Sequence, residues 1–268
     1  MNFSFNRLKV ILLLNKGLSR TVPIVTLTSD LGKDTYQVAK AKMQLEGLVQ
    51  GVKIFDISHD VSPFAIDEAA YLLNSCINDF PEGTVHIMAV DADIYKYKRL
   101  LAAFYNKQVI MAVDNGFLPM LLEGHDNKLY EIPVDDTLKL SPATLRNVVL
   151  PAAAGILNHG IDAVGALTAD PLEKTLEKPL VEENSLRGKV VYVNNYHNSV
   201  TNISRSVFDT ERMGRYFEIT LNRYDRITDI NDTYSQQPEG ECLCFFNENG
   251  LLEIAVNRGK ASQLLGLE

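Results

Sequence analysis

Apolar segments with the length of buried strands alternate with segments of helical periodicity over the first half of the chain. This alternation constrains the fold more than any other feature, because strands joined through helices pair in parallel and are covered on both faces. Hydrophobic residues make up 46% of the 268 residues, enough to bury a sizeable core. We predict strands within 23–32, 52–58, 84–91 and 108–114, and helices at 36–49, 65–80 and 117–122.

An aspartate lies at or near the end of each of these strands: Asp30, Asp56, Asp91 and Asp114. Ligands of open parallel sheets bind outside the carboxyl ends of the strands, so we expect the four carboxylates to converge on one crevice. Asp30 lies in a turn that Gly32 permits. It has two interpretations: it accepts hydrogen bonds from both hydroxyls of a ribose, or it caps the following helix.

The character of the sequence changes after a charged segment at 170–188 that contains two prolines. Short runs of alternating apolar residues follow it and indicate a mainly β domain, a small barrel or sandwich. The turn "NENG" at 247–250 is typical of a hairpin. We predict strands at 189–196, 216–222, 242–246 and 251–257, and we divide the chain into an extension (1–21), an α/β domain (22–172), a linker (173–186) and a β domain (187–268).

Charge and composition exclude several partners. The 26 Lys and Arg residues are outnumbered by 34 Asp and Glu, and no basic run with interleaved aromatic residues occurs, so we expect no nucleic acid. The apolar run at 10–14 is too short for a membrane span, so we expect no membrane partner. Three cysteines give no disulfide or zinc framework, which favours a cytoplasmic protein.

No sequence signature for a nucleotide triphosphate, a dinucleotide, an α/β-hydrolase or a zinc site is present. His59 and His197 lack a second ligand at metal spacing, so we interpret both as structural and expect no metal. The segment "NNYHNSVTNIS" (194–204) is rich in asparagine, which both donates and accepts hydrogen bonds. It is either a site for a neutral polar ligand or an amino-acid tail, or a polar turn.

Seven segments in order resemble one family, the S-adenosyl-L-methionine (SAM) hydrolases or hydroxide adenosyltransferases, which also include SAM-dependent chlorinases and the fluorinase. The resemblance extends from about residue 23 to 267. It rests on "TLTSDLG", "FDISHDVSPF" with "EAAYLL", "FPEGTVHIMAVD", "VDNGFL", "LRNVVLPAAAGI", "NNYHNSVTNIS" and "NENGLLEIAVNRGKASQLLG". It implies a Rossmann-like α/β domain with a mostly parallel sheet, a smaller C-terminal β-barrel domain, and a homotrimer whose ligand lies between the N-domain of one subunit and the C-domain of the next.

The resemblance also implies a set of binding residues. Asp30 corresponds to the carboxylate that holds the ribose hydroxyls, and Phe64 to an aromatic side chain near the ribose. Asn198 corresponds to a contact with the methionine part, while Asn194 replaces an aspartate that binds the methionine amino group. The complete predicted set is Asp30, Phe64, Asn115, Asn194, Asn198, Glu248 and Asn249.

The groups that act on the attacking water in the hydrolases are replaced in this chain. Ala65, Asp67 and Thr144 occupy the positions of the family's aspartate, arginine and histidine. Asp67 is a candidate general base, and Thr144 is a candidate for orienting a water. Asp91 and Asp93 are further candidates, which the altered loop after the third strand supplies.

Three hypotheses follow. The chain binds SAM or a related adenosyl compound and hydrolyses it to adenosine and methionine at the ribose 5′-carbon, with SAM as substrate and no cofactor. Alternatively, it is a catalytically inactive homologue that binds the adenosyl ligand. A third hypothesis has a different nucleophile or another adenosyl thioether substrate.

Overall fold

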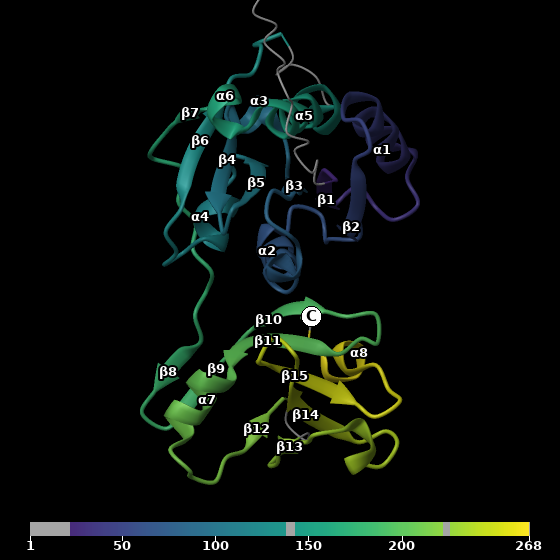
Figure 1. Cartoon of the computed structure of the whole chain (residues 1–268). Helices are drawn as coiled ribbons and strands as arrows, with labels where there is room; N and C mark the ends of the chain where they lie inside the picture. Colours follow the sequence, from purple (N-terminus) through teal and green to yellow (C-terminus); the bar gives the residue numbers. More distant parts are fainter. Residues whose placement is uncertain (1–21, 138–142, 222–225, 268) are drawn as a thin grey trace, which may run out of the picture.

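The computed structural model describes residues 22–137, 143–221 and 226–267, and the predicted extension at 1–21 lies outside them. The chain forms two lobes, joined by an extended segment between β7 (Ala166–Leu167) and β8 (Leu180–Glu182) (Figure 1). The upper lobe in this view comes from the N-terminal part of the chain and the lower lobe from the C-terminal part. Among the described residues, no helix has the length and apolar character needed to cross a membrane.

A seven-stranded sheet forms the centre of the N-terminal lobe, in the order β2-β1-β3-β5-β4-β6-β7. The first four strands in this order are parallel, as predicted. β4 is antiparallel to β5, and β6 is antiparallel to β4, so β6 again points in the direction of the parallel strands. The bounds are Ile24–Ser29 (β1), Lys53–Ser58 (β2), Val85–Ala89 (β3), Leu100–Tyr105 (β4), Gln108–Val113 (β5) and Lys128–Ile132 (β6).

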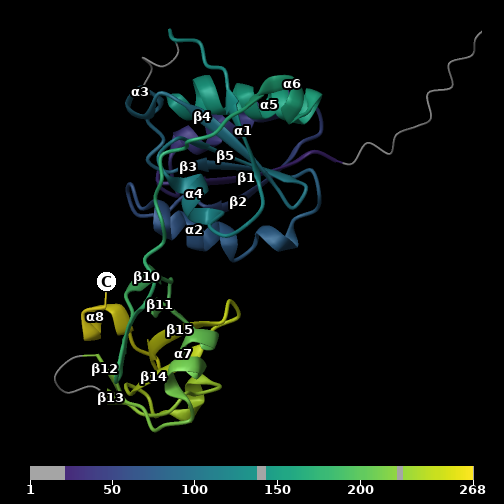
Figure 2. The ribbon, with the colours of Figure 1, turned by 90° about the vertical axis from the view of Figure 1, so that its left-hand side faces the viewer.

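Helices cover both faces of this sheet (Figure 2). Val25 and Leu27 of β1 belong to a buried cluster with the helices α1 and α5, whereas Met88 and Ile110 belong to a second cluster with α2 and α4. Successive strand residues point to opposite faces, which is why two cores form. The helices are Tyr36–Leu48 (α1), Ile66–Asn74 (α2), Ile94–Tyr97 (α3), Phe117–Leu121 (α4), Leu150–His159 (α5) and Ile161–Val164 (α6), with a π-helical turn at Leu145–Val149 and a 3₁₀ turn at Ile77–Asp79.

The helix predicted at 65–80 is too long. The α-helix ends at Asn74, and Ser75 donates a side-chain hydrogen bond of 2.7 Å to the carbonyl of Tyr71. Cys76 makes a similar contact with the carbonyl of Leu72. Such local bonds occupy helix carbonyls and compete with further helix growth. The chain then forms the 3₁₀ turn that leads to Pro81.

The C-terminal lobe contains a four-stranded antiparallel sheet in the order β10-β11-β15-β14, with two short hairpins beside it. The predicted hairpin turn at 247–250 is confirmed, with Gly250 at a φ of 71°. The strands are Ser185–Arg187 (β9), Val190–Val193 (β10), Ser199–Ser204 (β11), Ile219–Thr220 (β12), Arg226–Ile227 (β13), Cys242–Phe246 (β14) and Leu251–Val256 (β15), and the helices are Arg205–Arg212 (α7), Ala261–Leu265 (α8) and a 3₁₀ turn at Tyr234–Gln236.

The strand predicted at 216–222 is much shorter in the structure. Residue 222 lies outside the described residues; among 216–221, only Ile219–Thr220 pairs, and its partner is the equally short β13. Phe217 instead packs its ring at right angles to Phe208 of α7, with 5.0 Å between the ring centroids. Side-chain packing of Phe217 therefore holds this segment in place, with little contribution from strand pairing.

The two lobes touch where α2 faces the C-terminal sheet. The ring of Tyr71 on α2 lies 5.1 Å from that of Tyr192 on β10. Asn249, in the β14–β15 turn, donates from Nδ2 to Ser75 Oγ at 2.9 Å and to the Tyr71 hydroxyl at 3.3 Å. These contacts place β10 and the β14–β15 turn of the C-terminal lobe beside α2.

Candidate active site

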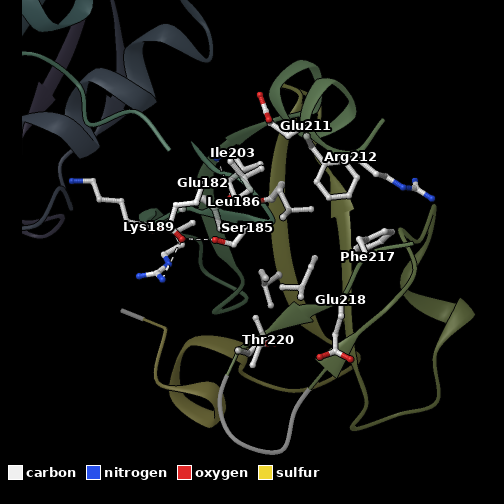
Figure 3. Close-up of a pocket in the computed structure, with 18 of the residues that line it drawn as sticks. Glu182, Ser185, Leu186, Lys189, Ile203, Glu211, Arg212, Phe217, Glu218 and Thr220 are labelled. Atoms are coloured by element: carbon white, nitrogen blue, oxygen red, sulfur yellow. Dashed lines mark hydrogen bonds and ion pairs between the residues drawn. The ribbon is translucent and has the colours of Figure 1, made fainter. Parts of the chain in front are cut away.

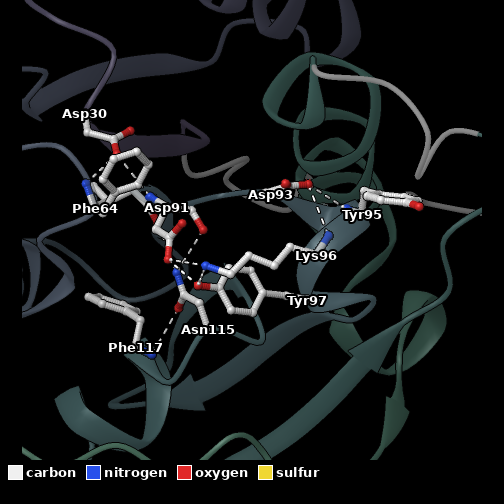
Figure 4. A network of polar contacts seen from close by, with 10 residues as sticks. Asp30, Phe64, Asp91, Asp93, Tyr95, Lys96, Tyr97, Asn115 and Phe117 are labelled. Carbon is white, nitrogen blue, oxygen red and sulfur yellow. Dashed lines mark hydrogen bonds and ion pairs between the residues drawn. The ribbon is translucent and has the colours of Figure 1, made fainter.

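Asp30 connects three loops at the carboxyl end of the sheet. It directly follows β1, and its Oδ2 accepts hydrogen bonds from the backbone N–H of Phe64 at 3.1 Å and of Asp91 at 3.2 Å. These donors belong to the loops that follow β2 and β3 (Figure 4). Because β1 lies between β2 and β3, one carboxylate reaches both neighbouring loops. Two of the four strand-end aspartates, Asp30 and Asp91, therefore converge as predicted.

The other two aspartates lie elsewhere, which corrects the prediction of a single crevice. Asp56 lies within β2 and binds Lys42 of α1 and His59. Partial burial acts to raise the pKa of Asp56, but the hydrogen bonds from Lys42 and His59 outweigh it and hold the pKa below its usual value. Asp114 is buried and binds Arg99, with Oδ2 at 2.9 Å from Nη1. Both carboxylates therefore form structural ion pairs.

Phe64 combines an unusual backbone with an exposed ring. Its φ is 67°, a left-handed conformation that non-glycine residues rarely adopt, and 71% of its surface is exposed. Strained residues persist where the surroundings hold them, and the hydrogen bond to Asp30 holds this one. The ring lies beside the Asp30 carboxylate and is largely exposed, so it is available for a ligand (Figure 4).

Asp91 is the most connected residue of the site. It also has a left-handed backbone, with a φ of 46°. Its Oδ2 accepts a hydrogen bond from the Tyr97 hydroxyl and lies 3.6 Å from the Lys96 ammonium. Burial and, to a smaller extent, the hydrogen bond to Asp91 raise the pKa of Tyr97. The phenol therefore remains protonated at neutral pH and donates to the carboxylate.

Asn115 and Thr144 lie under the loop that carries Asp91. Asn115 has no exposed surface, and its Nδ2 donates to the carbonyls of Val90 at 3.0 Å and Asp91 at 3.3 Å. The buried Thr144 hydroxyl accepts from the backbone N–H of Ile94 at 3.4 Å. In this conformation both side chains hold the loop in place. Their predicted roles, a substrate contact for Asn115 and a water contact for Thr144, stay predictions.

The two remaining acidic candidates differ in their surroundings. Asp67 lies in the first turn of α2 and is half-buried, and its side chain forms no hydrogen bond or ion pair with the described part of the chain. Asp93 is exposed and caps α3, where Oδ1 accepts from the backbone N–H of Tyr95 and Lys96 at 2.9 and 3.2 Å. Our sequence analysis did not predict this helix cap, which gives Asp93 a structural role.

A buried carboxylate organises the predicted binding residues of the C-terminal lobe. Glu253 on β15 is only 5% exposed, and its Oε1 accepts from Asn194 Nδ2 at 3.0 Å and Asn198 Nδ2 at 2.9 Å. Its Oε2 accepts from Asn247 Nδ2 at 3.2 Å. Our sequence prediction missed Glu253, although a single carboxylate within the apolar run "LLEIAV" is a detectable signal.

Glu248 and Asn249 lie at the tip of the β14–β15 turn and are exposed. Asn249 uses its amide to contact α2 of its own chain, as described above. Within the described residues, no hydrogen bond or ion pair joins Asn194 or Asn198 to Asp30 or Phe64. The predicted binding residues therefore form two groups in a single chain, one in each lobe.

A cavity in the C-terminal lobe is separate from both groups. It measures about 1020 Å³ and lies within the C-terminal lobe between the β8–β9 hairpin, α7 and β12 (Figure 3). None of the predicted site residues lines it. Among the described residues, no three His, Cys, Asp or Glu side chains are grouped so that they can hold a metal ion.

Known proteins resemble this chain over nearly its whole length. A curated (R)-S-adenosyl-L-methionine hydrolase from Thermus thermophilus is 29% identical, with 91% of this chain and 96% of the relative covered. A protein of the same name from Methanocaldococcus jannaschii is 25% identical over 91% and 92% of the two chains. A fluorinase from an Actinoplanes species is 23% identical over 88% and 91%.

The fold and the family models agree with these relatives. The crystal structure of an uncharacterized conserved protein from Thermotoga maritima superimposes with a TM-score of 0.79 at 26% identity, over 91% of this chain and 96% of that one. The model of the SAM hydroxide adenosyltransferase N-terminal domain matches residues 25–165, and that of the C-terminal domain matches residues 188–268. This chain therefore belongs to the SAM hydroxide adenosyltransferase family.

Proposed function

We propose that this protein binds S-adenosyl-L-methionine and hydrolyses it to adenosine and methionine by displacement at the ribose 5′-carbon. Membership of the SAM hydroxide adenosyltransferase family supports this proposal, as do relatives that are named (R)-S-adenosyl-L-methionine hydrolase. The proposal requires no cofactor, because the sulfonium sulfur leaves as a neutral thioether without further activation.

The single observation that carries the proposal is the state of the Asp30 carboxylate. Its Oδ2 is held by two backbone donors, whereas its Oδ1 receives no hydrogen bond from the described residues. A carboxylate oxygen with free lone pairs at the carboxyl end of a strand suits the two hydroxyls of a ribose. The exposed ring of Phe64 beside it offers an apolar surface for the same ligand.

The reaction makes modest demands on the protein. A water oxygen forms a bond to C5′ while the C5′–S bond breaks and its electron pair goes to sulfur. The protein must bind the cation, exclude bulk water and align one water molecule with C5′. In our proposal, Asp30 and Phe64 bind the adenosyl part of the cation, and Asn194 and Asn198 bind its methionine part.

We further propose that the protein is a homotrimer in which the N-terminal lobe of one subunit and the C-terminal lobe of the next form each site. The separation of the two groups of binding residues in one chain supports this arrangement. We assign 22–172 and 187–268 to the two domains and 173–186 to the linker, in line with the ranges of the family models. Light scattering at micromolar concentration tests the assembly, and a monomer would contradict the shared site.

We place the protein in the cytoplasm. Two of its cysteines, Cys76 and Cys244, are free thiols. Free thiols persist in a reducing compartment, whereas secreted proteins tend to pair them.

Incubation of the purified protein with S-adenosyl-L-methionine tests the proposed reaction. Adenosine and methionine are followed by chromatography, and binding is measured on the same sample by calorimetry. We expect the two products to appear in equal amounts and to be absent with Asp30→Ala. Heat of binding without product would instead identify an inactive adenosyl-binding homologue.

A further inference from the structure

We infer that Asp91 is the catalytic residue that accepts a proton from the attacking water, and that Tyr97 is a positioning residue that holds its carboxylate. This inference rests on the proposed hydrolysis and names the groups that perform it. The inference supplies a proton acceptor where two of the family positions offer none. Ala65 has no functional group, and the Thr144 hydroxyl already accepts a hydrogen bond from the backbone N–H of Ile94.

The placement of Asp91 relative to Asp30 is the first step. The backbone N–H of Asp91 donates to Asp30 Oδ2 at 3.2 Å, so Asp91 is next to the carboxylate that we assign to the ribose. In a nucleoside the reacting 5′-carbon is attached to C4′ of the same ribose ring whose 2′- and 3′-hydroxyls Asp30 holds. Asp67, by contrast, forms no contact of this kind with the described residues of the site.

The loop that carries Asp91 is held at several points, which is the second step. Asn115 fixes its carbonyl side, Thr144 fixes Ile94, and Asp30 fixes the Asp91 N–H. The left-handed backbone of Asp91 is maintained against its conformational cost by these contacts. Catalytic groups need such support, because small displacements lower their effectiveness.

The division of work between the two carboxylate oxygens is the third step. Oδ2 is occupied by Tyr97 and faces Lys96, while Oδ1 receives no hydrogen bond from the described residues. The Asp91 side chain is 12% exposed, so water reaches it although most of its surface is covered. One oxygen is thus anchored, and the other is free to accept from a water.

The chemical step balances in atoms and charge. The water oxygen bonds to C5′, the C5′–S bond breaks with its electron pair on sulfur, and one water proton passes to Asp91 Oδ1 and then to solvent. The products are neutral methionine thioether and adenosine, with one proton in place of the sulfonium charge. A carboxylate is a sufficient base because the positively charged leaving group does not need acid assistance.

Site-directed variants of the full chain test the inference by separating turnover from binding. With Asp91→Asn we expect kcat for S-adenosyl-L-methionine to fall by about 100-fold or more, since general bases contribute about that factor. The calorimetric Kd should stay within about threefold, because Asp30 and Phe64 bind the nucleoside. With Tyr97→Phe we expect a smaller loss, about tenfold in kcat, at an unchanged KM.

A matched control exists in the same lobe. Tyr130 donates to Asp162 Oδ1 at 2.8 Å in a second tyrosine–aspartate pair, outside the site. Asp162→Asn and Tyr130→Phe remove the same kind of contact and should leave kcat unchanged. Formate added to Asp91→Ala should restore part of the rate, which a merely structural role of Asp91 would not permit. Thermal melting checks that every variant is folded.

The outcomes distinguish the inference from the proposed function. If the wild-type protein releases no adenosine, the proposed function fails and the inference fails with it. If the wild type is active and Asp91→Asn keeps its kcat, only the inference is overturned. Loss of turnover with Asp67→Asn and not with Asp91→Asn would assign the base to Asp67 instead.

Discussion

Histidine 86 is buried in the centre of the larger lobe although its side chain can take up a proton. It is 1% exposed, with Nδ1 at 2.9 Å from Thr26 Oγ1 and Nε2 at 3.0 Å from Gln108 Oε1. The Gln108 amide nitrogen donates to the carbonyls of Ile77 and Phe80, so its oxygen faces the ring and accepts from Nε2. The neutral imidazole thus has a partner at each nitrogen. Burial, partly opposed by the Gln108 hydrogen bond, lowers its pKa from 6.5 to about 4.

This shift predicts an acid-sensitive fold. Below pH 6.5 the unfolded chain protonates His86 while the folded chain does not, until the pH reaches about 4. The contribution of neutral His86 to the free energy of unfolding is therefore fully present above pH 6.5. It is lost as the pH drops from 6.5 to about 4, by about 3 kcal/mol in total. Urea unfolding of the wild type and His86→Gln at several pH values measures it. The variant should lose less stability between pH 6.5 and 4, and equal slopes would contradict the prediction.

A direct measurement covers the case in which His86→Gln does not fold. NMR titration of the wild-type imidazole should place its pKa near 4. A pKa near 6.5 would contradict the buried neutral ring.

Single residues also differ in how far the sequence predicts them. The position of Asp30 at the carboxyl end of the sheet could be predicted because its signal is local: an aspartate and a glycine follow a buried strand. Glu253 was missed because its role depends on three asparagines from other segments. A buried carboxylate is stable only when donors surround it, and those donors are brought together by the fold.

At the scale of elements, the parallel half of the sheet was predicted and the antiparallel half was not. β4 and β5 form a hairpin in which Tyr105 pairs with Gln108, so only Asn106 and Lys107 form the turn. Both have positive φ, 47° and 60°, as a type I′ turn requires. The usual second residue of such a turn is glycine, and lysine gives no sequence signal. The missed hairpin is what turns the sheet antiparallel beyond β5.

The turn between β5 and α4 supplies a prediction at this scale. Gly116 has a φ of 93°, and a Cβ there would lie 2.5 Å from Cγ of Lys174. Gly116→Ala should therefore destabilise the protein by about 2 kcal/mol, from the left-handed backbone and from displacement of the linker side chain. Urea denaturation with an unchanged m value measures this loss.

Gly124 provides the control for the contact between residue 116 and Lys174. Its φ is 77°, but a Cβ there would meet nothing within 4 Å. Gly124→Ala should carry only the backbone cost, about 1 kcal/mol. If the two variants lose the same stability, the contact between Gly116 and Lys174 has no energetic effect.

At the scale of the whole molecule, Arg99 fixes the point where the chain leaves the larger lobe. Its guanidinium binds Asp114 at 2.9 Å and Glu131 at 3.0 Å, and donates to Thr168 Oγ1 at 2.9 Å and the Asp170 carbonyl at 3.1 Å. Asp114 Oδ1 also accepts from the backbone N–H of Leu172 at 2.8 Å. These contacts tie residues 168–172, which directly precede the linker, to the sheet. The charges and the two prolines of 170–188 predict a linker there, but such long-range contacts could not be predicted from the sequence.

Assembly is the property that a single chain reveals least, and mixed oligomers test it directly. If Asp30 and Asn198 have the binding roles that we propose, Asp30→Ala should inactivate the half-site of the N-terminal lobe and Asn198→Ala that of the C-terminal lobe. In a shared site, each variant alone should be inactive. When the two are co-expressed with different tags and purified together, a site is intact only where an unaltered N-terminal lobe meets an unaltered C-terminal lobe. Random assortment then restores about a quarter of the wild-type turnover per subunit.

The same mixture discriminates against a site within one chain. There, every chain would carry one defective half, and co-expression would restore nothing. Asn198 is buried and donates to Glu253, so its replacement leaves a carboxylate with one donor fewer. Thermal unfolding of Asn198→Ala alone must therefore match the wild type within a few degrees, so that loss of turnover reflects the site and recovered turnover reflects complementation between subunits.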